Sequence, residues 1–565
     1  MDARTKALEE LTAPGAPFEV VVEDVRGVPL PVFAHRHRNL RDLLESSVRH
    51  GEADYFTLGA ETLTFANNLA RSASVATALR DRYGIRKGDR VAIFSANRPD
   101  YAVVFWAAVS AGAIVTAYNG WWTVDEVRHA TDLTSPAIVF GDQRRLERVA
   151  HIDLGAPIVE FGAEFDALAC AAPTAALPDV AIDEDDPAVI LFTSGTTGRA
   201  KGAVVSHRGL VGFVQVTFCN GAVKARAAQL EGLSPPPAPA GPTVTLMTSP
   251  MFHVSGLFAG VILGLASGMR LVLREGRFDE EDVLRIIERE RITSWAPVGG
   301  LGMRMIDHPR FADYDTSSIR MISFGGGPTS PASRAKIQRA FPSIGNNMAN
   351  GYGSSETVAA VSSNSGAEYD AMPESAGRIN PTCEVEIWDE RDQPLPDGVE
   401  GEVHARSAYN MLGYWNDAEA TRKTLKTGGW LATGDIGRIE QGMLTINSRA
   451  RDMIIRGGEN IYPIEVERRL DAYAGVAESA VVGVDHPVLG QEVKAIVVPV
   501  AGTDLDTDDF DTEDLARWVG ETLAPYKIPT LWERRTEALP RNASGKVLKT
   551  VLIGEAVAPS DDHVA

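Results

Sequence analysis

Short runs of β-branched and other apolar residues alternate with helical patterns along this chain from about Leu40 onward. In the segment 279–291, between two such runs, aliphatic residues recur with the period of a helix. Uncharged strands that alternate with helices are typical of parallel sheets with helices on both faces. The chain is therefore predicted to be an α/β protein, with buried strands at 91–95, 137–140, 188–192, 244–248, 271–273 and 321–324.

The pattern changes after Ala371, where two closely spaced strand patterns, 383–389 and 401–407, are joined by a turn-rich segment. This spacing predicts antiparallel pairing or a small β-barrel-like subdomain. Beyond Arg449 the chain has strand and helix patterns of its own. Since 565 residues exceed the size at which one hydrophobic core stops growing, we expect a large N-terminal domain and a small α+β C-terminal domain.

The stretch from Tyr101 to Tyr118 is uncharged and about long enough to span a bilayer. Gly112 divides it into a helix-length part and a β-branched part, which favours a buried helix followed by a buried strand. The formal net charge of −21 and the pI near 5.0 argue against nucleic acid or an anionic membrane surface as the main partner. We therefore expect no nucleic-acid partner and no stable membrane insertion, and any phosphate site must be local.

The three cysteines, Cys170, Cys219 and Cys383, lie far apart and form no CxxC pair. Neither a disulfide framework nor a zinc site is indicated by this spacing. The first residues carry charges where a secretion signal would have its apolar core. A reducing, cytoplasmic location is therefore the expectation.

The sequence TSGTTGRAKG, from Thr193 to Gly202, directly follows a predicted buried strand. Its glycines permit tight backbone turns, its hydroxyls and backbone amides can face an anion, and Arg199 and Lys201 supply positive charge. The GxxxxGK[ST] spacing is absent from the chain, so this is not a Walker loop. A flexible glycine-serine linker is the alternative, but the preceding strand and the two cations argue against it. The segment is predicted to cradle phosphate.

Five further segments follow in order: FGGGP at 324–328, NGYGSSET at 350–357, TGD at 433–435, SRARDMIIRGGENIYPIEVE at 448–467 and PRNASGK at 540–546. With these segments the chain resembles, over nearly its whole length, the adenylate-forming superfamily of acyl-CoA synthetases, luciferases and peptide-synthetase adenylation domains. The resemblance implies an N-terminal adenylation domain over 1–448, a hinge over 449–452 and a mobile C-terminal domain over 453–565. It also implies that the chain binds ATP and Mg²⁺.

The nucleotide site that the resemblance implies also agrees with the chemistry of its residues. Tyr352 would stack on adenine, Asn350 would pair with its amino edge, and Glu356 would hold the divalent cation. Asp435 would accept hydrogen bonds from both ribose hydroxyls, because a carboxylate offers two oxygens. Arg449 would add a ribose or phosphate contact.

Two positions depart from the family pattern: Ser355 replaces the usual threonine, and Ser448 replaces the usual glycine. The hydroxyl is kept at Ser355, so its phosphate contact is expected to survive. Gly325, Gly326 and Gly327 end a strand pattern, and their bare backbone would let a flat base lie close, with a ligand-free turn as the alternative. The nucleotide-binding residues implied are Thr193, Ser194, Gly195, Thr196, Thr197, Gly198, Lys201, Gly325, Gly326, Gly327, Pro328, Asn350, Gly351, Tyr352, Gly353, Ser354, Ser355, Asp435 and Arg449.

Lys546 follows a serine and a glycine near the C-terminus, and by itself it would be a solvated surface lysine. A carboxylate that attacks the α-phosphate brings two anions together, however, and a mobile cation must bridge them. By resemblance Lys546 is the catalytic lysine, and Arg451 is the hinge about which the C-terminal domain rotates. The CoA channel would be lined by Gly457, Gly458, Glu459 and Asn460.

His253 lies between an apolar strand pattern and an apolar helix pattern, where a lone histidine is more often a core residue than a catalyst. The resemblance places an aromatic gate at this position, near the α-phosphate and at the mouth of the acyl pocket. It thus adds His253 to Lys546 and Glu356 as a catalytic candidate. The candidate pocket walls are His253, Val254, Trp295 and Val298, with ordinary core packing as the alternative for Trp295 and Val298.

The resemblance as a whole implies an ATP-dependent acid–thiol ligase of the acyl-CoA synthetase branch. In the first step the acid attacks the α-phosphorus of ATP, which gives acyl-AMP and pyrophosphate. In the second step the small domain rotates, and a thiol, expected to be that of CoA, takes the acyl group. A medium- or long-chain fatty acid is the expected substrate, with aryl, alicyclic and steroid side-chain acids open.

Three alternatives stay open. The acyl group could pass to a carrier-protein thiol, or the chain could be a luciferase-like oxygenase, although nothing beyond the shared framework suggests oxygen chemistry. The chain could also be a non-catalytic nucleotide-binding regulator on the same fold, against which the presence of both Glu356 and Lys546 argues. A homodimer is the expected assembly.

Overall fold

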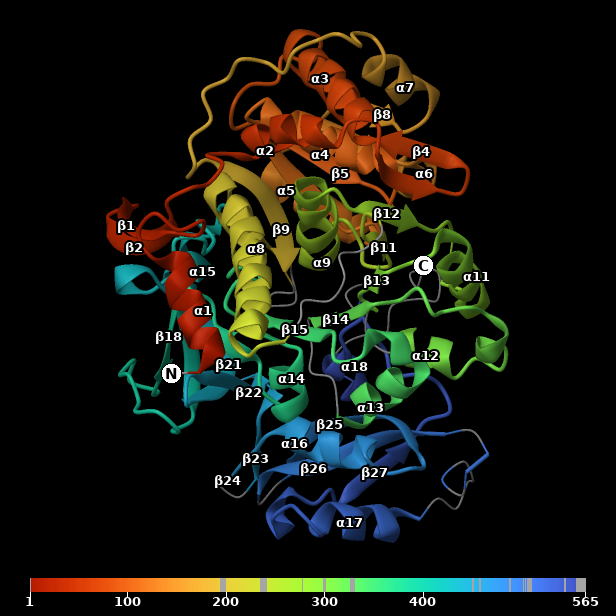
Figure 1. The fold of residues 1–565 in the computed structure, drawn as a ribbon. Coiled ribbons are helices and arrows are strands. Elements are labelled where there is room, and N and C mark those ends of the chain that lie inside the picture. Colours follow the sequence, from red (N-terminus) through yellow and green to blue (C-terminus); the bar gives the residue numbers. More distant parts are fainter. Residues whose placement is uncertain are drawn as a thin grey trace.

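The computed structural model describes residues 2–193, 200–233, 241–276, 278–297, 301–325, 331–449, 452–456, 459–486, 489–500, 502–503, 505, 511–542 and 545–554. These residues form two large sheets, a smaller C-terminal sheet and a two-stranded hairpin. In Figure 1 the first sheet and its helices lie at the top, the second sheet crosses the middle, and the C-terminal sheet lies at the bottom. The predicted α/β architecture, with a large N-terminal part and a small C-terminal part, is confirmed.

The first sheet has seven strands in the order β20-β10-β9-β6-β5-β7-β8. The central strands β5 to β9 run parallel, whereas β10 and β20 are antiparallel to their neighbours. The bounds are β5 Arg90–Phe94, β6 Ile114–Tyr118, β7 Ile138–Gly141, β8 Ile158–Glu160, β9 Pro187–Thr193, β10 Lys201–Ser206 and β20 Gly413–Tyr414. The parallel strands predicted at 91–95, 137–140 and 188–192 are therefore confirmed.

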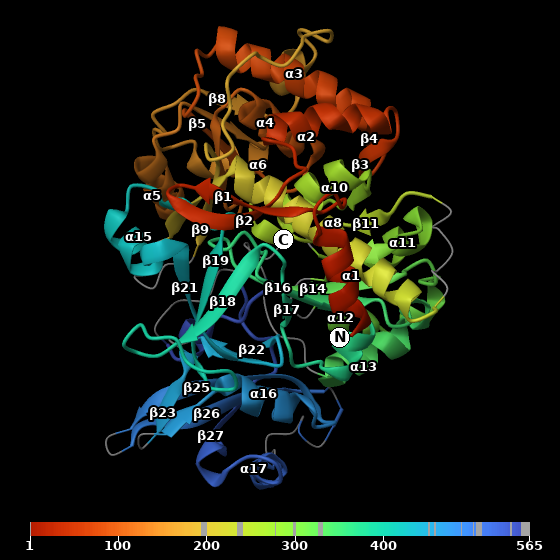
Figure 2. The same ribbon diagram turned by 60° about the vertical axis from the view of Figure 1, so that its left-hand side comes forward.

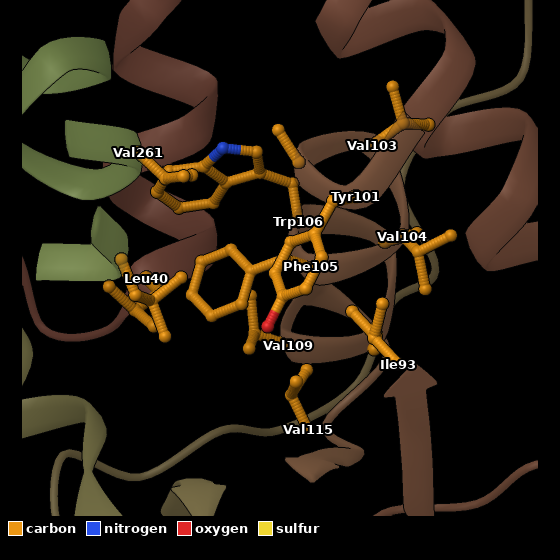
Figure 3. Close-up of a cluster of buried hydrophobic side chains, with 14 of the residues drawn as sticks. Leu40, Ile93, Tyr101, Val103, Val104, Phe105, Trp106, Val109, Val115 and Val261 are labelled. Atoms are coloured by element: carbon orange, nitrogen blue, oxygen red, sulfur yellow. The ribbon is translucent and has the colours of Figure 1, made fainter. Parts of the chain in front are cut away.

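The uncharged stretch 101–118 forms most of helix α4 (Pro99–Ser110) and strand β6, with the chain turning at Gly112 as predicted. Every residue of α4 is buried, because α3 (Phe65–Asp81) covers its outer side. Figure 3 shows its side chains among those of the core, with Trp106 towards Val261 and Phe105 towards Leu40. Within the described residues, every helix is too short or too polar to cross a bilayer.

The second sheet has thirteen strands in the order β18-β19-β21-β22-β17-β16-β15-β14-β13-β11-β12-β3-β4. Strands β3 and β11 to β15 form a parallel run, and the strands from β16 onward pair antiparallel, as predicted after Ala371. These later strands extend the parallel sheet through β15 and β16 instead of forming a separate unit. The bounds are β3 Asp54–Leu58, β4 Glu61–Thr64, β11 Val244–Leu246, β12 Arg270–Leu273, β13 Ser294–Trp295, β14 Met321–Gly325, β15 Met348–Tyr352, β16 Ser362–Ser365, β17 Gly377–Ile379, β18 Cys383–Trp388, β19 Gly401–Ser407, β21 Trp430–Glu440 and β22 Met443–Arg449.

Helices cover the two large sheets, and the long helix α8 (His207–Leu230) packs with the N-terminal helix α1 (Ala3–Thr12). The hairpin β1 (Val20–Val25) and β2 (Val28–Phe33) shares an apolar cluster with α8. Figure 2 shows α1, the hairpin and α8 on one side of the molecule. The remaining helices are α2 Leu40–Ser46, α5 Val124–Thr134, α6 Gln143–Val149, α7 Ala163–Ala169, α9 Val254–Gly256, α10 Leu263–Ser267, α11 Glu280–Glu290, α12 Leu301–Ile306, α13 Pro331–Ala340, α14 Ala367–Ala371 and α15 Ala418–Thr424.

The C-terminal sheet has five strands, with β24-β23-β26-β25 in order and β27 beside β26. One apolar cluster joins it to the helices α16 and α17, and a second joins β25 and β26 to the segment around α18. Figure 1 places α18 between β14 and the C-terminal sheet. The bounds are β23 Ile454–Arg456, β24 Glu459–Ile461, β25 Val476–His486, β26 Gly490–Pro499, β27 Leu531–Arg534, α16 Pro463–Asp471, α17 Thr512–Gly520 and α18 Lys549–Leu552.

Candidate active site

The two ends of the predicted phosphate loop are held by neighbouring strands. Thr193 ends β9, Lys201 begins β10, and the two residues pair in the antiparallel register. Gly202 follows in β10, where a Cβ atom would lie 2.7 Å from Ile190, so only glycine fits without a shift. Residues 194–199 lie outside the described residues; among them are Ser194, Gly195, Thr196, Thr197 and Gly198.

A tyrosine, Tyr414, lies between Glu356 and Lys201 at the end of this loop. It is not among the site residues predicted from the sequence. The Tyr414 hydroxyl donates a hydrogen bond to Glu356 Oε1 at 2.9 Å, and Lys201 Nζ lies 5.3 Å from the centre of the Tyr414 ring. Tyr414 is placed by β20, in which it pairs with Ala203 of β10. Burial raises the pKa of Tyr414, with Glu356 adding to the rise, so the phenol stays a donor at neutral pH. No local sequence pattern predicts the hydrogen bond between Tyr414 and Glu356, because the two residues are 58 positions apart.

The turn around Glu356 has a strained backbone. The buried Val358 and its neighbour Ala359 adopt left-handed φ values of 54° and 53°, which are unfavourable for a β-branched residue above all. Gly353 permits the close approach, since a Cβ atom there would lie 2.5 Å from Ala359 Cα. The Ser354 N–H donates to Thr357 Oγ1 at 2.8 Å and closes the turn around Ser355 and Glu356. Strain of this kind persists where the surrounding structure fixes a functional group.

The candidate ribose site joins the end of β15 to β21 through a side-chain contact, although the two strands are not neighbours in the sheet. The Tyr352 hydroxyl donates to Asp435 Oδ2 at 2.7 Å, and Asp435 is buried. Asp435 pairs with Arg449 across β21 and β22, whereas the side chain of Arg449 lies outside the described residues. The structure thus brings together Tyr352, Asp435 and the backbone of Arg449, three of the residues predicted to bind the nucleotide.

The glycine segment lies at the carboxyl ends of β14 and β15. Gly325 pairs with Gly351, and the preceding Phe324 pairs with Asn350, so bare backbone of two parallel strands lies side by side. The carboxyl ends of parallel strands are where α/β sheets bind ligands. The remaining predicted residues here, Gly326, Gly327 and Pro328, lie outside the described residues.

His253 immediately precedes α9, which continues into a π-helix, Leu257–Ile262. Asn97 holds the preceding turn, because its side chain donates to the Ser249 carbonyl and accepts from the Met251 N–H, both at 2.8 Å. Gly256 lets α9 close on this turn, since a Cβ atom there would lie 2.0 Å from the Pro250 carbonyl oxygen. π-Helical turns occur frequently at functional sites.

The His253 ring lies in an aromatic group. Its centre is 4.8 Å from that of Phe252, whose ring meets Trp121 edge-on at 6.1 Å. Burial lowers the pKa of His253 to about 4, so the imidazole is neutral at neutral pH. Within the described part of the chain, no side chain or backbone group hydrogen-bonds to it. A neutral ring in this setting can act as an aromatic wall or as a single hydrogen-bond donor, but not as a cation.

The other candidate pocket walls differ in exposure. Val254 is half-buried, whereas Trp295 has no exposed surface and belongs to the core cluster of the second sheet. The Trp295 indole N–H donates to Thr248 Oγ1 at 3.3 Å. In this conformation the indole presents no surface to a pocket, which agrees with the core-packing alternative. Val298 lies outside the described residues.

Only some of the site residues predicted in the C-terminal part lie within the described residues. Lys546 lies in a short hairpin that precedes α18, and Glu459 begins β24. The backbone of Asn460 pairs with Ile455, whereas Arg451, Gly457 and Gly458 lie outside the described residues. In Figure 1 the neighbouring α18 is on the side of the C-terminal sheet that faces β14. Val547, which follows Lys546, packs in one cluster with β25, β26 and α18, so the Lys546 hairpin lies against the C-terminal sheet.

Comparisons with known proteins identify the family of the chain. A family model described as AMP-binding enzyme matches residues 44–415, and one described as AMP-binding enzyme C-terminal domain matches residues 465–546. The chain is 33% identical over 505 residues to a feruloyl-CoA synthase of Amycolatopsis sp, which covers 89% of this chain and 94% of the relative. It is 29% identical over 572 residues to a long-chain-fatty-acid–CoA ligase of Yersinia pestis. That match covers 94% of this chain and 96% of the relative.

Among solved structures, an ATP-bound crystal structure of MatB from Rhodopseudomonas palustris superimposes with a TM-score of 0.77. It is 27% identical in sequence and covers 91% of this chain and 98% of its own. The chain therefore belongs to the AMP-binding enzyme family. It is an ATP-dependent acid–thiol ligase of the acyl-CoA synthetase branch.

Proposed function

We propose that this enzyme activates an apolar carboxylic acid as acyl-AMP and then transfers the acyl group to CoA. One observation supports the adenylation step: residues from distant segments of the chain are in contact in two neighbouring groups around the turn 352–357. Lys201, Tyr414 and Glu356 form a group beside the phosphate loop, and Tyr352 with Asp435 forms the nucleoside part. A cation, a fixed carboxylate and a ribose acceptor are the groups that ATP requires.

In the first step the chain positions two anions against each other. The phosphate loop and Lys201 would hold the phosphates, Asp435 would accept from the ribose hydroxyls, and Lys546 would neutralise the charge that develops between the substrate carboxylate and the α-phosphate. The substrate carboxylate oxygen forms the bond to phosphorus, and pyrophosphate leaves with its electron pair. The neutral His253 ring would border the acyl group at the pocket mouth.

Glu356 fits a role in holding Mg²⁺. Its Oε1 already accepts from Tyr414, which fixes the carboxylate and leaves lone pairs on both oxygens for a cation. Within the described residues no group of three or more His, Cys, Asp or Glu side chains could hold a metal. A lone carboxylate nevertheless suits Mg²⁺, which is usually bound through one or two carboxylates together with substrate phosphates. When bound, Mg²⁺ would neutralise phosphate charge.

In the second step the C-terminal domain, 453–565, would rotate about the hinge 449–452 relative to the N-terminal domain, 1–448. Rotation would remove Lys546 from the site and bring Gly457, Gly458, Glu459 and Asn460 to line a channel for the CoA thiol. The thiol sulfur would then bond to the acyl carbon as AMP leaves. The relatives named as CoA ligases support CoA over a carrier-protein thiol.

The acid is proposed as a class. A medium- or long-chain fatty acid fits an apolar pocket mouth, and the long-chain-fatty-acid relative supports it. The feruloyl-CoA synthase relative supports an aryl acid of similar bulk, as does the aromatic group of Trp121, Phe252 and His253, on which a flat acyl group could stack. A cytoplasmic location and a homodimer complete the proposal; the three free cysteines support a reducing compartment.

The test is the consumption of the CoA thiol in the presence of ATP, with aryl, alicyclic and fatty acids of graded length. The proposal expects thiol loss that depends on ATP and on an apolar acid, with short polar acids inactive. A phosphopantetheinylated carrier protein replaces CoA in a parallel arm. Activity with the carrier protein and none with CoA would overturn the choice of acceptor, and no pyrophosphate release with any acid would overturn the enzymatic reading.

A further inference from the structure

The segment that carries Lys546 is a hydrogen-bonded hairpin. Arg541 and Val547 form a β-bridge, and the Asn542 N–H donates to the Lys546 carbonyl at 2.9 Å. In return the Lys546 N–H donates to Asn542 Oδ1 at 2.9 Å, and the Arg541 guanidinium donates to the Gly545 carbonyl at 2.8 Å. These bonds fix the backbone of Lys546 within the hairpin.

The hairpin rests on the C-terminal sheet through apolar contacts. Val547 and Leu552 of α18 belong to one cluster with Val482 of β25 and Ile496 of β26. Hydrophobic contacts are non-directional, so they hold the hairpin against the sheet without setting its orientation. The direction in which Lys546 leaves the sheet requires contacts of another kind.

Two ion pairs supply these contacts, one on each side of Lys546. Before it, the Arg541 guanidinium pairs with the Glu478 carboxylate of β25. After it, Lys549 Nζ lies 2.6 Å from the Glu467 carboxylate. The four side chains are between 18% and 28% exposed, so water screens these pairs less than fully exposed ones.

Glu467 joins three elements. It belongs to α16, and its Oε1 accepts the Val481 N–H of β25 at 2.9 Å, while Lys549 of α18 pairs with the same carboxylate. Lys549 Nζ also donates to the Val481 carbonyl at 3.0 Å. The end of the Lys546 hairpin is therefore fixed to both α16 and β25 by charge-assisted hydrogen bonds, which are shorter and stronger than neutral ones.

We propose that Glu467 and Glu478 are positioning residues, which hold the hairpin at the angle that brings Lys546 to the nucleotide site. The inference rests on the proposed role of Lys546 in adenylation. A displacement of about 1 Å at a reacting group can cost about 100-fold in rate. Loss of either pair frees one side of the hairpin, whereas loss of both leaves, besides the Lys549–Val481 hydrogen bond, only the non-directional contacts.

The test separates the two half-reactions in the full-length enzyme. Glu467→Gln and Glu478→Gln keep the side-chain shape and remove the charge. Each is expected to lower the maximal rate of ATP–pyrophosphate exchange about 10-fold, and the double variant about 100-fold. The KM for ATP and the rate of thioester formation from supplied acyl-AMP should stay within about twofold of the parent enzyme, because neither depends on where Lys546 points.

Glu521→Gln is the matched control. Glu521 pairs with Arg469 of the same helix α16 at 2.6 Å, but it lies on the α17 side, away from the hairpin. This variant should leave both half-reactions unchanged. Melting temperatures are measured for all variants, so that a loss of folding is visible.

Two results would overturn the inference: unchanged exchange in the double variant, or equal loss of both half-reactions with a lowered melting temperature. Lys546→Ala is measured beside them. If it abolishes exchange while the glutamine variants do not, the inference fails and the proposed function stands. If Lys546→Ala leaves exchange intact, both fail.

Discussion

At the scale of single residues, the candidate site depends on side chains that orient other side chains. Tyr414 carries no charge at neutral pH, yet it connects the carboxylate of Glu356 with the ammonium of Lys201. The Tyr352 hydroxyl likewise donates a hydrogen bond to the carboxylate of Asp435. Buried or half-buried partners of this kind restrict the orientation of the groups that touch a ligand.

Tyr414→Phe removes only the hydroxyl that donates to Glu356. We expect the apparent affinity for Mg²⁺ in the presence of ATP to fall about 10- to 100-fold, as is typical when the partner of a metal-binding residue is lost. Binding of Mn²⁺ as a probe, followed by electron paramagnetic resonance, and the Mg²⁺ dependence of pyrophosphate exchange both measure it. Tyr314→Phe is the control, since that hydroxyl also donates to a glutamate, Glu281, at 2.9 Å. An unchanged Mg²⁺ dependence in Tyr414→Phe would contradict the role of Tyr414 in orienting Glu356.

His253 allows a test of the aromatic gate. Because burial lowers its pKa to about 4, replacing it with phenylalanine removes no charge at neutral pH. We expect His253→Phe to keep adenylation within about tenfold and His253→Ala to raise the KM for the acid more strongly, since alanine also removes the ring. Steady-state kinetics with varied acid checks this. If phenylalanine proves as harmful as alanine, the imidazole nitrogen contacts the reacting groups and the gate reading is wrong.

At the scale of elements, buried strands were predictable and contacts between distant strands were not. The runs at 91–95 and 188–192 are apolar on both faces, so their burial and type follow from local sequence. The run at 321–324 is a strand as predicted, but the prediction that it is buried was wrong, because Met321 is 37% exposed and Ser323 lies on the same face. The register of β20 beside β10 depends on pairing across the whole large domain, and the Tyr414 contact follows from that register alone. That the antiparallel strands continue the second sheet could not be predicted either, because it depends on the pairing of β16 with β15.

The raised pKa of Asp471, the last residue of α16, leads us to expect that the stability of the C-terminal domain depends on pH. Burial, with Glu467 and Glu478 adding to it, raises the pKa of Asp471 to about 7 from 3.8, against the hydrogen bond donated by Ser479. As the pH rises, Asp471 loses its proton in the unfolded chain before it does so in the folded one. The contribution of the protonated carboxyl to the free energy of unfolding is therefore complete below about pH 4, and it disappears as the pH rises to about 7. The slope reaches about 1.4 kcal/mol per pH unit.

Asp471→Asn should flatten this dependence, because asparagine carries no charge at any of these pH values. Hydrogen exchange of peptides from α16 and β25, corrected for the intrinsic rates at each pH, measures local stability in the intact protein. We expect protection in the parent enzyme to decrease from about pH 5 to about pH 8 more than in the variant. Equal slopes in the two proteins would show that Asp471 is ionised throughout this range.

At the scale of the whole molecule, the proposed chemistry divides between two parts of the chain. The large sheets carry the candidate nucleotide-binding residues, those of β14 and β15 at the carboxyl ends of parallel strands, and the hairpin with Lys546 packs on the C-terminal sheet. One acyl-AMP would therefore meet two different sets of residues in the two steps. This division predicts that a change on the small domain can stop one half-reaction and leave the other.

Lys546→Ala tests this central claim most directly. ATP–pyrophosphate exchange and thioester formation from chemically supplied acyl-AMP and CoA are measured on the same preparation. Loss of a group that stabilises transition-state charge typically costs about 10²- to 10³-fold. We expect a loss of at least that size in exchange, with thioester formation within about threefold of the parent enzyme. Equal loss of both half-reactions, or unimpaired exchange, would contradict it.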